Sequence, residues 1–182
     1  IFVPEFATRV INSPGEPGVS YHMGVGFVTG AAREADLLRE FKAIAQARNR
    51  SMVARINPHM APVTLDYDAD VLPLTPKGNP TERHICMAYD AKAKALFPDP
   101  EARAAFWAEK LGVELPAVRE CLENPAAFQG LIRAKTMKSG GVGYVQPEGL
   151  EFPRLDQLNQ FSLANGAIPT MAWLDGTTSA EE

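Results

Sequence analysis

The spacing of hydrophobic and polar residues changes several times along the chain, and each spacing predicts a different element. Residues 1–9 (IFVPEFATR) and 20–28 (SYHMGVGFV) are rich in apolar and aromatic residues, and a turn rich in Pro and Gly separates them. This pattern predicts two strands. Between residues 32 and 56, apolar positions recur close to every 3.6 residues among charged ones, which predicts an amphipathic helix. We expect Pro58 to end this helix, because proline cannot donate the backbone hydrogen bond that a helix interior needs.

The middle of the chain begins with a segment rich in Pro and Asp and continues with several short helical patterns. A polar residue directly precedes proline at Asn79-Pro80, Asp99-Pro100 and Asn124-Pro125. Each pair is a typical helix start, since proline loses no hydrogen bond in the first helical turn. We therefore expect residues 58–138 to form an all-helical insertion in a body made of residues 1–57 and 139–182.

The last part of the chain returns to patterns that fit the body. Residues 152–166 (FPRLDQLNQFSLANG) predict an amphipathic helix that ends at Gly166, and residues 167–176 (AIPTMAWLDG) predict a buried strand followed by a polar loop. The order strand, strand, helix, insertion, helix, strand is typical of an α/β fold. Working groups in such folds lie at the carboxyl ends of strands, so Asp175 is a candidate site residue.

The composition is that of a globular protein and argues against several classes of partner. The 182 residues include 46 % hydrophobic and 22 % charged residues, and the net charge is only −4. A protein that coats long nucleic acid would carry a basic surface, so we do not expect such a partner. The two cysteines, Cys86 and Cys121, fit no disulfide or zinc pattern, and we expect a cytoplasmic location. No apolar run reaches the roughly 18 residues of a membrane-spanning helix, so we expect no membrane partner.

Two side chains stand out because they are typical metal ligands within apolar segments. Glu5 lies in FVPEF and His22 lies in SYHMGVGF, and an unpaired carboxylate is costly to bury. If the two strands are neighbours, these side chains can meet at one end of the sheet. A carboxylate and an imidazole together suit Zn²⁺, Mn²⁺ or Fe. A purely structural role stays open, with Glu5 in water or paired with His22, and His22 as a hydrogen-bonded core residue.

Two further motifs resemble binding loops but lack the full pattern. Residues 66–70 (DYDAD) alternate as in a calcium loop, but Val71 and Lys77 occupy the positions where an EF-hand has Gly and Glu. Residues 140–143 (GGVG) lack the Lys-Ser/Thr context of a P-loop. We expect a solvated loop or strand edge at the first motif and a flexible hinge at the second.

Four segments, in the same order along the chain, resemble the PHP family (polymerase and histidinol phosphatase). Two of them are VPEFATRV, a strand with one glutamate, and YHMGVGF, a strand with one histidine followed by glycines. The third, VLPLTPKGNPTERHICMAYDAKA, resembles the inserted segment of PHP phosphoesterases, although Arg83 directly precedes His84 without the family's intervening proline. The fourth, LNQFSLANGAIPTMAWLDG, resembles a helix and strand that end in His-Pro in the family. The resemblance spans nearly the whole chain.

The resemblance implies a partial, distorted (β/α)7 barrel with metal ions at its strand ends and the helical insertion as a lid. It implies hydrolysis of a small phosphomonoester or a nucleotide by a water that two or three ions of Mn, Zn, Fe or Mg activate. By position, Glu5, His22 and Asp175 would be metal ligands. Arg83 and His84 would bind the substrate phosphate, and arginine suits phosphate because its planar fork matches the oxygens. The resemblance identifies no catalytic acid or base.

The chain departs from the family in several places, and other hypotheses therefore stay open. The family's first H-x-H and last D-x-H motifs are absent and both ends look cut, so we expect a fragment. Trp173 stands where the family has a histidine, which favours a non-catalytic PHP-like module that binds a ligand or a partner. The incomplete barrel would be closed in a homo-oligomer, or the chain is a proteolytic remnant with a simplified core. A third hypothesis is an α/β domain without a site.

Overall fold

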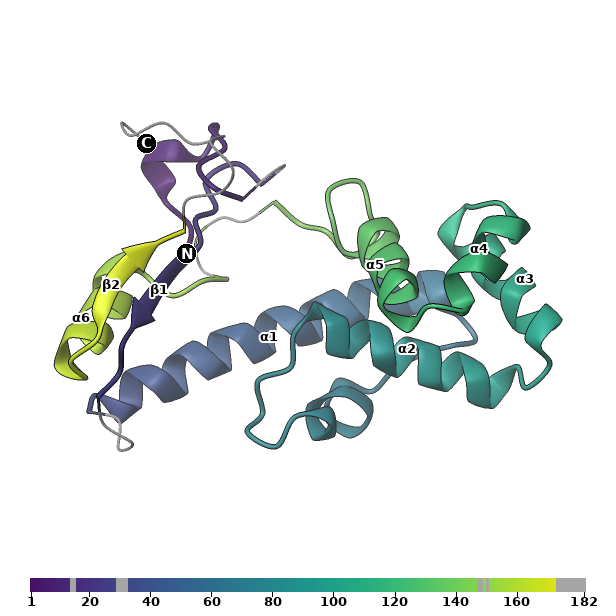
Figure 1. Cartoon of the computed structure of the whole chain (residues 1–182), viewed down its shortest axis with the longest axis horizontal. Coiled ribbons are helices and arrows are strands. Elements are labelled where there is room, and N and C mark those ends of the chain that lie inside the picture. Colours follow the sequence, from purple (N-terminus) through teal and green to yellow (C-terminus); the bar gives the residue numbers. More distant parts are fainter. Residues whose placement is uncertain (14–15, 29–32, 147–148, 150, 173–182) are drawn as a thin grey trace. The chain divides into compact units, whose positions relative to one another are not determined.

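The fold is described by a computed structural model that covers residues 1–13, 16–28, 33–146, 149 and 151–172 (Figure 1). The described residues form a mixed α/β structure that is mostly helical, with six α-helices and two strands. The chain divides into two compact units. Unit 1 consists of residues 1–47 and 146–182, and unit 2 consists of residues 48–145. Unit 2 therefore contains the whole of the predicted helical insertion.

Unit 1 contains a two-stranded antiparallel sheet, a helix that packs on it and the first part of α1 (Ala35–Met60) (Figure 1). Strand β1 (His22–Val25) pairs with β2 (Ile168–Met171), and His22 lies opposite Met171. Helix α6 (Leu155–Ala164) packs on both strands. The strands predicted within residues 20–28 and 167–176 are thus confirmed, although each is shorter than its apolar pattern.

One aromatic side chain joins α6 to the rest of unit 1. Phe161 is buried, and its ring centroid lies 5.8 Å from that of Phe27, which follows β1. The same ring lies 6.0 Å from Phe41 in α1 (Ala35–Met60), in an edge-to-face arrangement. Aromatic pairs favour such tilted geometries, so Phe161 fixes both the distance and the orientation of α6.

Two asparagines stabilise unit 1 by imitating a backbone peptide group. The Asn12 side chain accepts a hydrogen bond from the Tyr21 N–H at 2.7 Å and donates one to the Ala172 carbonyl at 2.7 Å. Asn165 accepts from the Arg33 N–H at 2.7 Å and donates to the Arg33 carbonyl at 3.0 Å. Asn12 and Asn165 are both buried, and these bonds satisfy their amides.

The strand predicted for residues 1–9 is wrong. Pro4–Phe6 form a short 3-10 helix, and the only pairing in this segment is an isolated bridge between Phe2 and Val19 among the described residues. Pro4 explains the difference, because its ring fixes the backbone near helical φ and it has no N–H for a sheet ladder. Glu5 therefore does not lie on a strand beside His22.

Unit 2 is a cluster of short helices that follows the second half of α1. Its elements are α2 (Glu82–Leu96), α3 (Pro100–Leu111), α4 (Leu115–Leu122), α5 (Pro125–Thr136), a π-helical turn (Tyr67–Val71) and a 3-10 turn (Leu72–Leu74). The predicted starts of α3 and α5 are confirmed. Asp99 and Asn124 are their N-caps, and each side chain accepts a backbone N–H of the first turn.

The predicted helix start at Asn79-Pro80 is wrong by two residues. Helix α2 begins at Glu82, and Thr81 is its N-cap. Thr81 and His84 form a capping box in which the Thr81 N–H donates to His84 Nδ1 at 3.0 Å. The Thr81 N–H thus finds its acceptor in the His84 side chain, which fixes the helix start at Glu82.

Helix α1 does not end at Pro58 but continues to Met60. Ile56 and Met60 are completely buried in the core of unit 2. Pro58 lies in the last turn, where its missing N–H removes a single helical hydrogen bond. Burial of two large side chains stabilises this turn by roughly 1.5–3 kcal/mol each, which outweighs the effect of the proline.

The core of unit 2 draws buried side chains from each of its α-helices. Trp107 of α3 belongs to this core and is 0 % exposed. Its ring centroid lies 5.2 Å from Phe106 and 5.1 Å from Phe128 of α5, and both pairs are T-shaped. Phe106 also stacks on Phe97 at 4.9 Å. The helices α3 and α5 are therefore joined by a continuous aromatic cluster.

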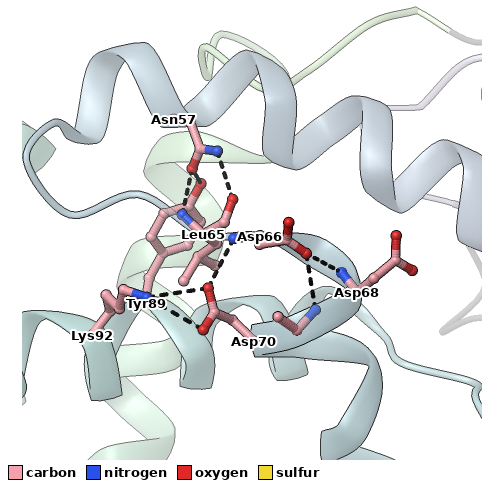
Figure 2. A network of polar contacts seen from close by, with 8 residues as sticks. Asn57, Leu65, Asp66, Asp68, Asp70, Tyr89 and Lys92 are labelled. Atoms are coloured by element: carbon pink, nitrogen blue, oxygen red, sulfur yellow. Dashed lines mark hydrogen bonds and ion pairs between the residues drawn. The ribbon is translucent and has the colours of Figure 1, made fainter.

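The acidic segment predicted to be a solvated loop or strand edge is instead a helical turn with structural partners (Figure 2). The Asp66 carboxylate accepts two backbone N–H groups of this turn at 2.9 Å each. Asp68 pairs with Arg50 at 2.6 Å, and Asp70 pairs with Lys92 at 3.3 Å. The bond to Arg50 lowers the pKa of Asp68 below its usual value. Each carboxylate thus has a protein partner in place of a calcium ion.

Candidate functional site

His22 is held between β1 and α6 by a single side-chain hydrogen bond. Its Nε2 atom lies 2.9 Å from the Oδ1 atom of Asn159 in α6. An amide oxygen can only accept, so Nε2 carries the hydrogen and donates it. The Nδ1 atom of the neutral ring then carries a lone pair. The half-buried His22 side chain therefore has one nitrogen bound to the protein and one that can bind a ligand.

The close approach of α6 to β1 depends on a residue without a side chain. A Cβ atom at Gly24 would lie 2.5 Å from Ser162 Oγ and 2.9 Å from Phe27 Cζ, which is closer than such atoms can approach. His22 and Gly24 lie on the same face of β1, and Asn159 and Ser162 lie on the same face of α6. Gly24 therefore lets the helix come near enough for the short Asn159 side chain to reach His22.

Glu5, the second predicted metal ligand, lies in unit 1 on the 3-10 helix Pro4–Phe6. Its side chain is exposed, and it makes no hydrogen bond or ion pair with another described residue. The direct pair with His22 that a purely structural role would provide is therefore not formed among the described residues, and the side-chain partner of His22 is Asn159. Glu5 is thus a solvated carboxylate, and its role as a metal ligand stays a prediction.

Arg83 and His84, the predicted phosphate-binding residues, lie in the first turn of α2 in unit 2. Arg83 is exposed and makes no hydrogen bond or ion pair with another described residue. Nδ1 of His84 accepts the Thr81 N–H, so Nε2 carries the hydrogen of the neutral ring and can donate it. Glu82, which lies between the N-cap residue Thr81 and Arg83, forms ion pairs with Arg133 and Lys138.

The last predicted ligand, Asp175, and the neighbouring Trp173 lie outside the described residues. Among the residues that the structure describes, no group of three or more His, Cys, Asp or Glu side chains could hold a metal ion. The two described candidates of unit 1, Glu5 and His22, therefore do not form a complete metal site by themselves, and the expected Mn, Zn, Fe or Mg ions stay predictions.

The buried cysteine next to the α2 start has a structural role. Cys86 is 0 % exposed, and its Sγ atom lies 3.9 Å from the sulfur of Met137. Burial raises the pKa of the Cys86 thiol to about 12. A thiol in this state is neither a nucleophile nor a metal ligand near neutral pH, and the side chain packs as a small hydrophobic residue.

Residues 140–143, predicted to be a flexible hinge, form a closely packed turn. A Cβ atom at Gly143 would lie 2.6 Å from the Ile56 side chain, and one at Gly141 would lie 2.6 Å from the Thr136 carbonyl carbon. The Arg55 guanidinium donates to the Gly143 carbonyl at 2.9 and 3.1 Å. These two glycines are therefore needed for close packing. Their N–H groups donate to the Lys138 and Thr136 carbonyls at 2.7 Å each and are not free to bind a phosphate.

Asn159 is the site residue that the sequence interpretation missed. It lies four residues after Leu155 and three before Ser162, within the stripe of α6 that faces the sheet. A polar residue in that stripe is the one signal that could have marked it, since the expected inward residues of this helix were apolar. Its partner His22 is 137 residues away in the sequence, so no local pattern links the two.

No described helix combines the length and the apolar character that crossing a membrane requires. In comparisons with known proteins, no family model matches the chain, and no curated protein or solved structure is significantly similar to it. The geometry around His22 and the first turn of α2 is therefore the basis for any functional proposal.

Proposed function

We propose that this protein is a metal-dependent hydrolase of phosphate esters of the PHP type, acting on a small phosphomonoester or a nucleotide. The observation that carries the proposal is the state of His22, whose Nε2 atom is bound to Asn159 while Nδ1 keeps a lone pair. Imidazoles that bind metals in proteins are commonly held in this way through their second nitrogen. The four ordered segments that resemble the PHP family support the same function.

In this proposal, His22 and Glu5 are metal ligands, and Asp175 is a third. An imidazole and an exposed, unpaired carboxylate are suitable donors for Mn²⁺, Zn²⁺ or Fe, and a second carboxylate adds an oxygen donor that also suits Mg²⁺. Bound ions of this kind lower the pKa of a water and stabilise the charge that builds on the phosphoryl oxygens. The proposal also includes the partial, distorted (β/α)7 barrel that the PHP resemblance implies.

Arg83 and His84, which lie in unit 2, are the hydrogen-bond donors for phosphate that the PHP resemblance implies. The Arg83 guanidinium is exposed and carries several N–H donors in a planar fork, which matches the oxygens of a phosphate. His84 adds an Nε2–H donor, because its Nδ1 atom is already bound to the N-cap residue. A small phosphate ester fits this pair of donors better than long nucleic acid, since the net charge of −4 gives no basic surface.

Elemental analysis tests the proposal directly. The protein is expressed from its complete coding sequence, loaded with Mn²⁺ or Zn²⁺, freed of excess metal and measured by inductively coupled plasma mass spectrometry. We expect two or more ions per chain in the wild type and fewer in Glu5→Gln and in His22→Ala, with unchanged circular dichroism. Arg83→Ala is the matched control, because it should keep the metal and lose turnover of p-nitrophenyl phosphate.

The opposite result would favour the alternative function. Trp173, which stands at the usual position of a family histidine, favours a non-catalytic module that binds a ligand or a partner on the same fold. Wild-type protein that retains no metal after loading would contradict the hydrolase and support this module. Full metal occupancy in both Glu5→Gln and His22→Ala would instead show that the ions bind elsewhere on the chain.

A further inference from the structure

We propose that a third strand completes the outer edge of β1, and that this strand is the segment of the same polypeptide that precedes Ile1 in the complete protein. The strand runs antiparallel to β1 and forms hydrogen bonds with the backbone of His22 and Gly24. The proposal concerns backbone pairing in the sheet, so it does not depend on the hydrolase function proposed above.

The hydrogen bonds of the sheet show which backbone groups of β1 face away from β2. The Ala172 N–H donates to the Tyr21 carbonyl at 3.0 Å, so the Tyr21 carbonyl faces the β2 side. Successive residues of an antiparallel strand direct their N–H and C=O groups alternately to the two sides. Met23 therefore faces β2, whereas His22 and Gly24 face the outer edge. On that edge, neither of the two makes a backbone hydrogen bond with another described residue.

The other edge of the sheet, the outer edge of β2, is closed to pairing by a proline. Pro169 lies opposite Gly24 in the register, so its backbone nitrogen faces outward from the sheet. Proline has no N–H to donate, and prolines on edge strands are a common protection against an added strand. Residues 21–25 (YHMGV) of the β1 edge contain no proline and no Lys, Asp or Glu. The outer edge of β1 thus lacks the protection that β2 has.

A backbone ladder on the β1 side of the sheet already begins at the first residues of the chain (Figure 1). The Ser20 N–H donates to the Ile1 carbonyl at 3.0 Å, and the Ile1 nitrogen donates to the Ser20 carbonyl at 2.9 Å. The Val3 N–H donates to the Gly18 carbonyl at 2.7 Å, and the bridge in this segment is antiparallel. Because Ser20 and His22 are two residues apart, their peptide groups face the same side. The open edge of β1 therefore continues this ladder.

The register of the ladder determines where the chain before Ile1 pairs. In an antiparallel ladder, one step forward along one strand is one step backward along the other. Ile1 lies opposite Ser20, so the second residue before Ile1 comes opposite His22. The fourth residue before Ile1 comes opposite Gly24 in the same way. A short extended segment in this register gives hydrogen-bond partners to every outward backbone group of β1.

The small size of the edge favours a segment of the same chain over a separate molecule. Strand β1 has 4 residues. At about 3.4 Å per residue, its edge is only about 14 Å long. A stable interface between separate proteins buries about 800 Å² on each partner, which one short strand does not provide. A covalently attached strand needs less contact, because its effective concentration at the edge is high. The edge thus fits a segment of this chain better than a second copy or another protein.

Amide hydrogen exchange measured by NMR tests the proposal on the protein expressed from its complete coding sequence. We expect the His22 and Gly24 amides to exchange roughly tenfold or more slowly than the Met171 amide. Met171 lies opposite His22, so its N–H faces the outer edge of β2 and is the internal control. Met23 should show a short Hα–Hα contact with the third residue before Ile1, as in a non-hydrogen-bonded antiparallel pair.

A proline substitution tests the same hydrogen bonds in the complete protein. His22→Pro and His22→Ala both remove the ring and its bond to Asn159, but only proline removes the outward N–H. We expect Gly24 protection to fall roughly 2- to 10-fold further in His22→Pro than in His22→Ala. Met171→Pro is the matched control, because it removes an N–H from the unpaired edge of β2 and should cause no such further loss at Gly24.

Several results would overturn the proposal. His22 and Gly24 amides that exchange as fast as the Met171 amide would show an open edge, and equal protection in His22→Pro and His22→Ala would show that the outward N–H has no partner. Protection that falls on dilution, with contacts between differently labelled copies, would assign the edge to a second copy. A complete protein without residues before Ile1 would also contradict it. None of these results depends on bound metal, so the hydrolase proposal is tested separately.

Discussion

Gly24→Ala is the substitution that tests most directly how closely α6 packs on β1. The new Cβ atom would lie 2.5 Å from Ser162 Oγ and 2.9 Å from Phe27 Cζ. Ser162 is completely buried and its hydroxyl donates to the Leu158 carbonyl at 2.8 Å, so it cannot easily turn away. Forcing a methyl group into such a contact costs about 1–3 kcal/mol.

A second effect opposes this cost. Replacing glycine by alanine in a strand stabilises the folded state by about 0.5–1 kcal/mol, because the unfolded chain loses freedom. The difference between the two effects leaves a net destabilisation of about 0–2.5 kcal/mol. We expect hydrogen exchange of the β1 amides to report this destabilisation as a lower free energy of opening.

Gly130→Ala is the matched control for this substitution. Gly130 lies inside α5, and a Cβ atom there would meet nothing within 4 Å. The same change should therefore stabilise unit 2 by about 0.5–1 kcal/mol, with the opposite sign to Gly24→Ala. In the double variant of Gly24→Ala with Ser162→Ala, removal of the Ser162 oxygen should recover part of the loss. A Gly24→Ala variant that is stabilised as Gly130→Ala is expected to be would refute the close-packing argument for the His22 site.

Two further predictions concern unit 2. Asn57→Ala removes three hydrogen bonds, two with the Leu65 backbone and one with the Tyr89 hydroxyl (Figure 2), and leaves these groups unsatisfied. It should lower the free energy of unfolding by roughly 1–3 kcal/mol in urea titrations, and an unchanged midpoint would contradict the structural role of this network. Cys86 should resist thiol reagents in the native protein, while the partly exposed Cys121 should react. Mass spectrometry measures the labelling of each cysteine, and rapid labelling of both would contradict the burial of Cys86. Burial raises the pKa of the Cys86 thiol to about 12. Above the unfolded thiol pKa of about 8.5, the unfolded state binds fewer protons than the native state, so stability should fall as pH rises from there.

The elements that the sequence predicted well are those with local signals. The starts of α3 and α5 follow from Asp99 and Asn124, because a cap and its helix lie within a few residues of each other. The end of α1 could not be predicted in this way. Pro58 is a local stop signal, but burial of Met60 against distant parts of unit 2 decides the outcome. Tertiary packing outweighs local preference there.

The candidate site shows the same difference between features with a local sequence signal and features that depend on tertiary packing. His22 stood out because it is polar within an apolar strand, a feature visible in a few residues. Glu5 stood out for the same reason, but Pro4 gave its segment a 3-10 conformation that removed it from the sheet. Asn159 could not be connected to His22, since their contact depends on how α6 packs on β1. The sequence therefore indicated one member of the contact, and the fold supplied the other.

The pairing of His22 with Met171 has a consequence for how the protein is made. A ribosome adds about 5–20 residues per second, so roughly 7–30 s pass between synthesis of the two partner strands. Unit 2 is one continuous segment, residues 48–145, and all of it emerges during that interval. We expect the helical unit to fold first during translation, while the apolar β1 strand waits without its partner.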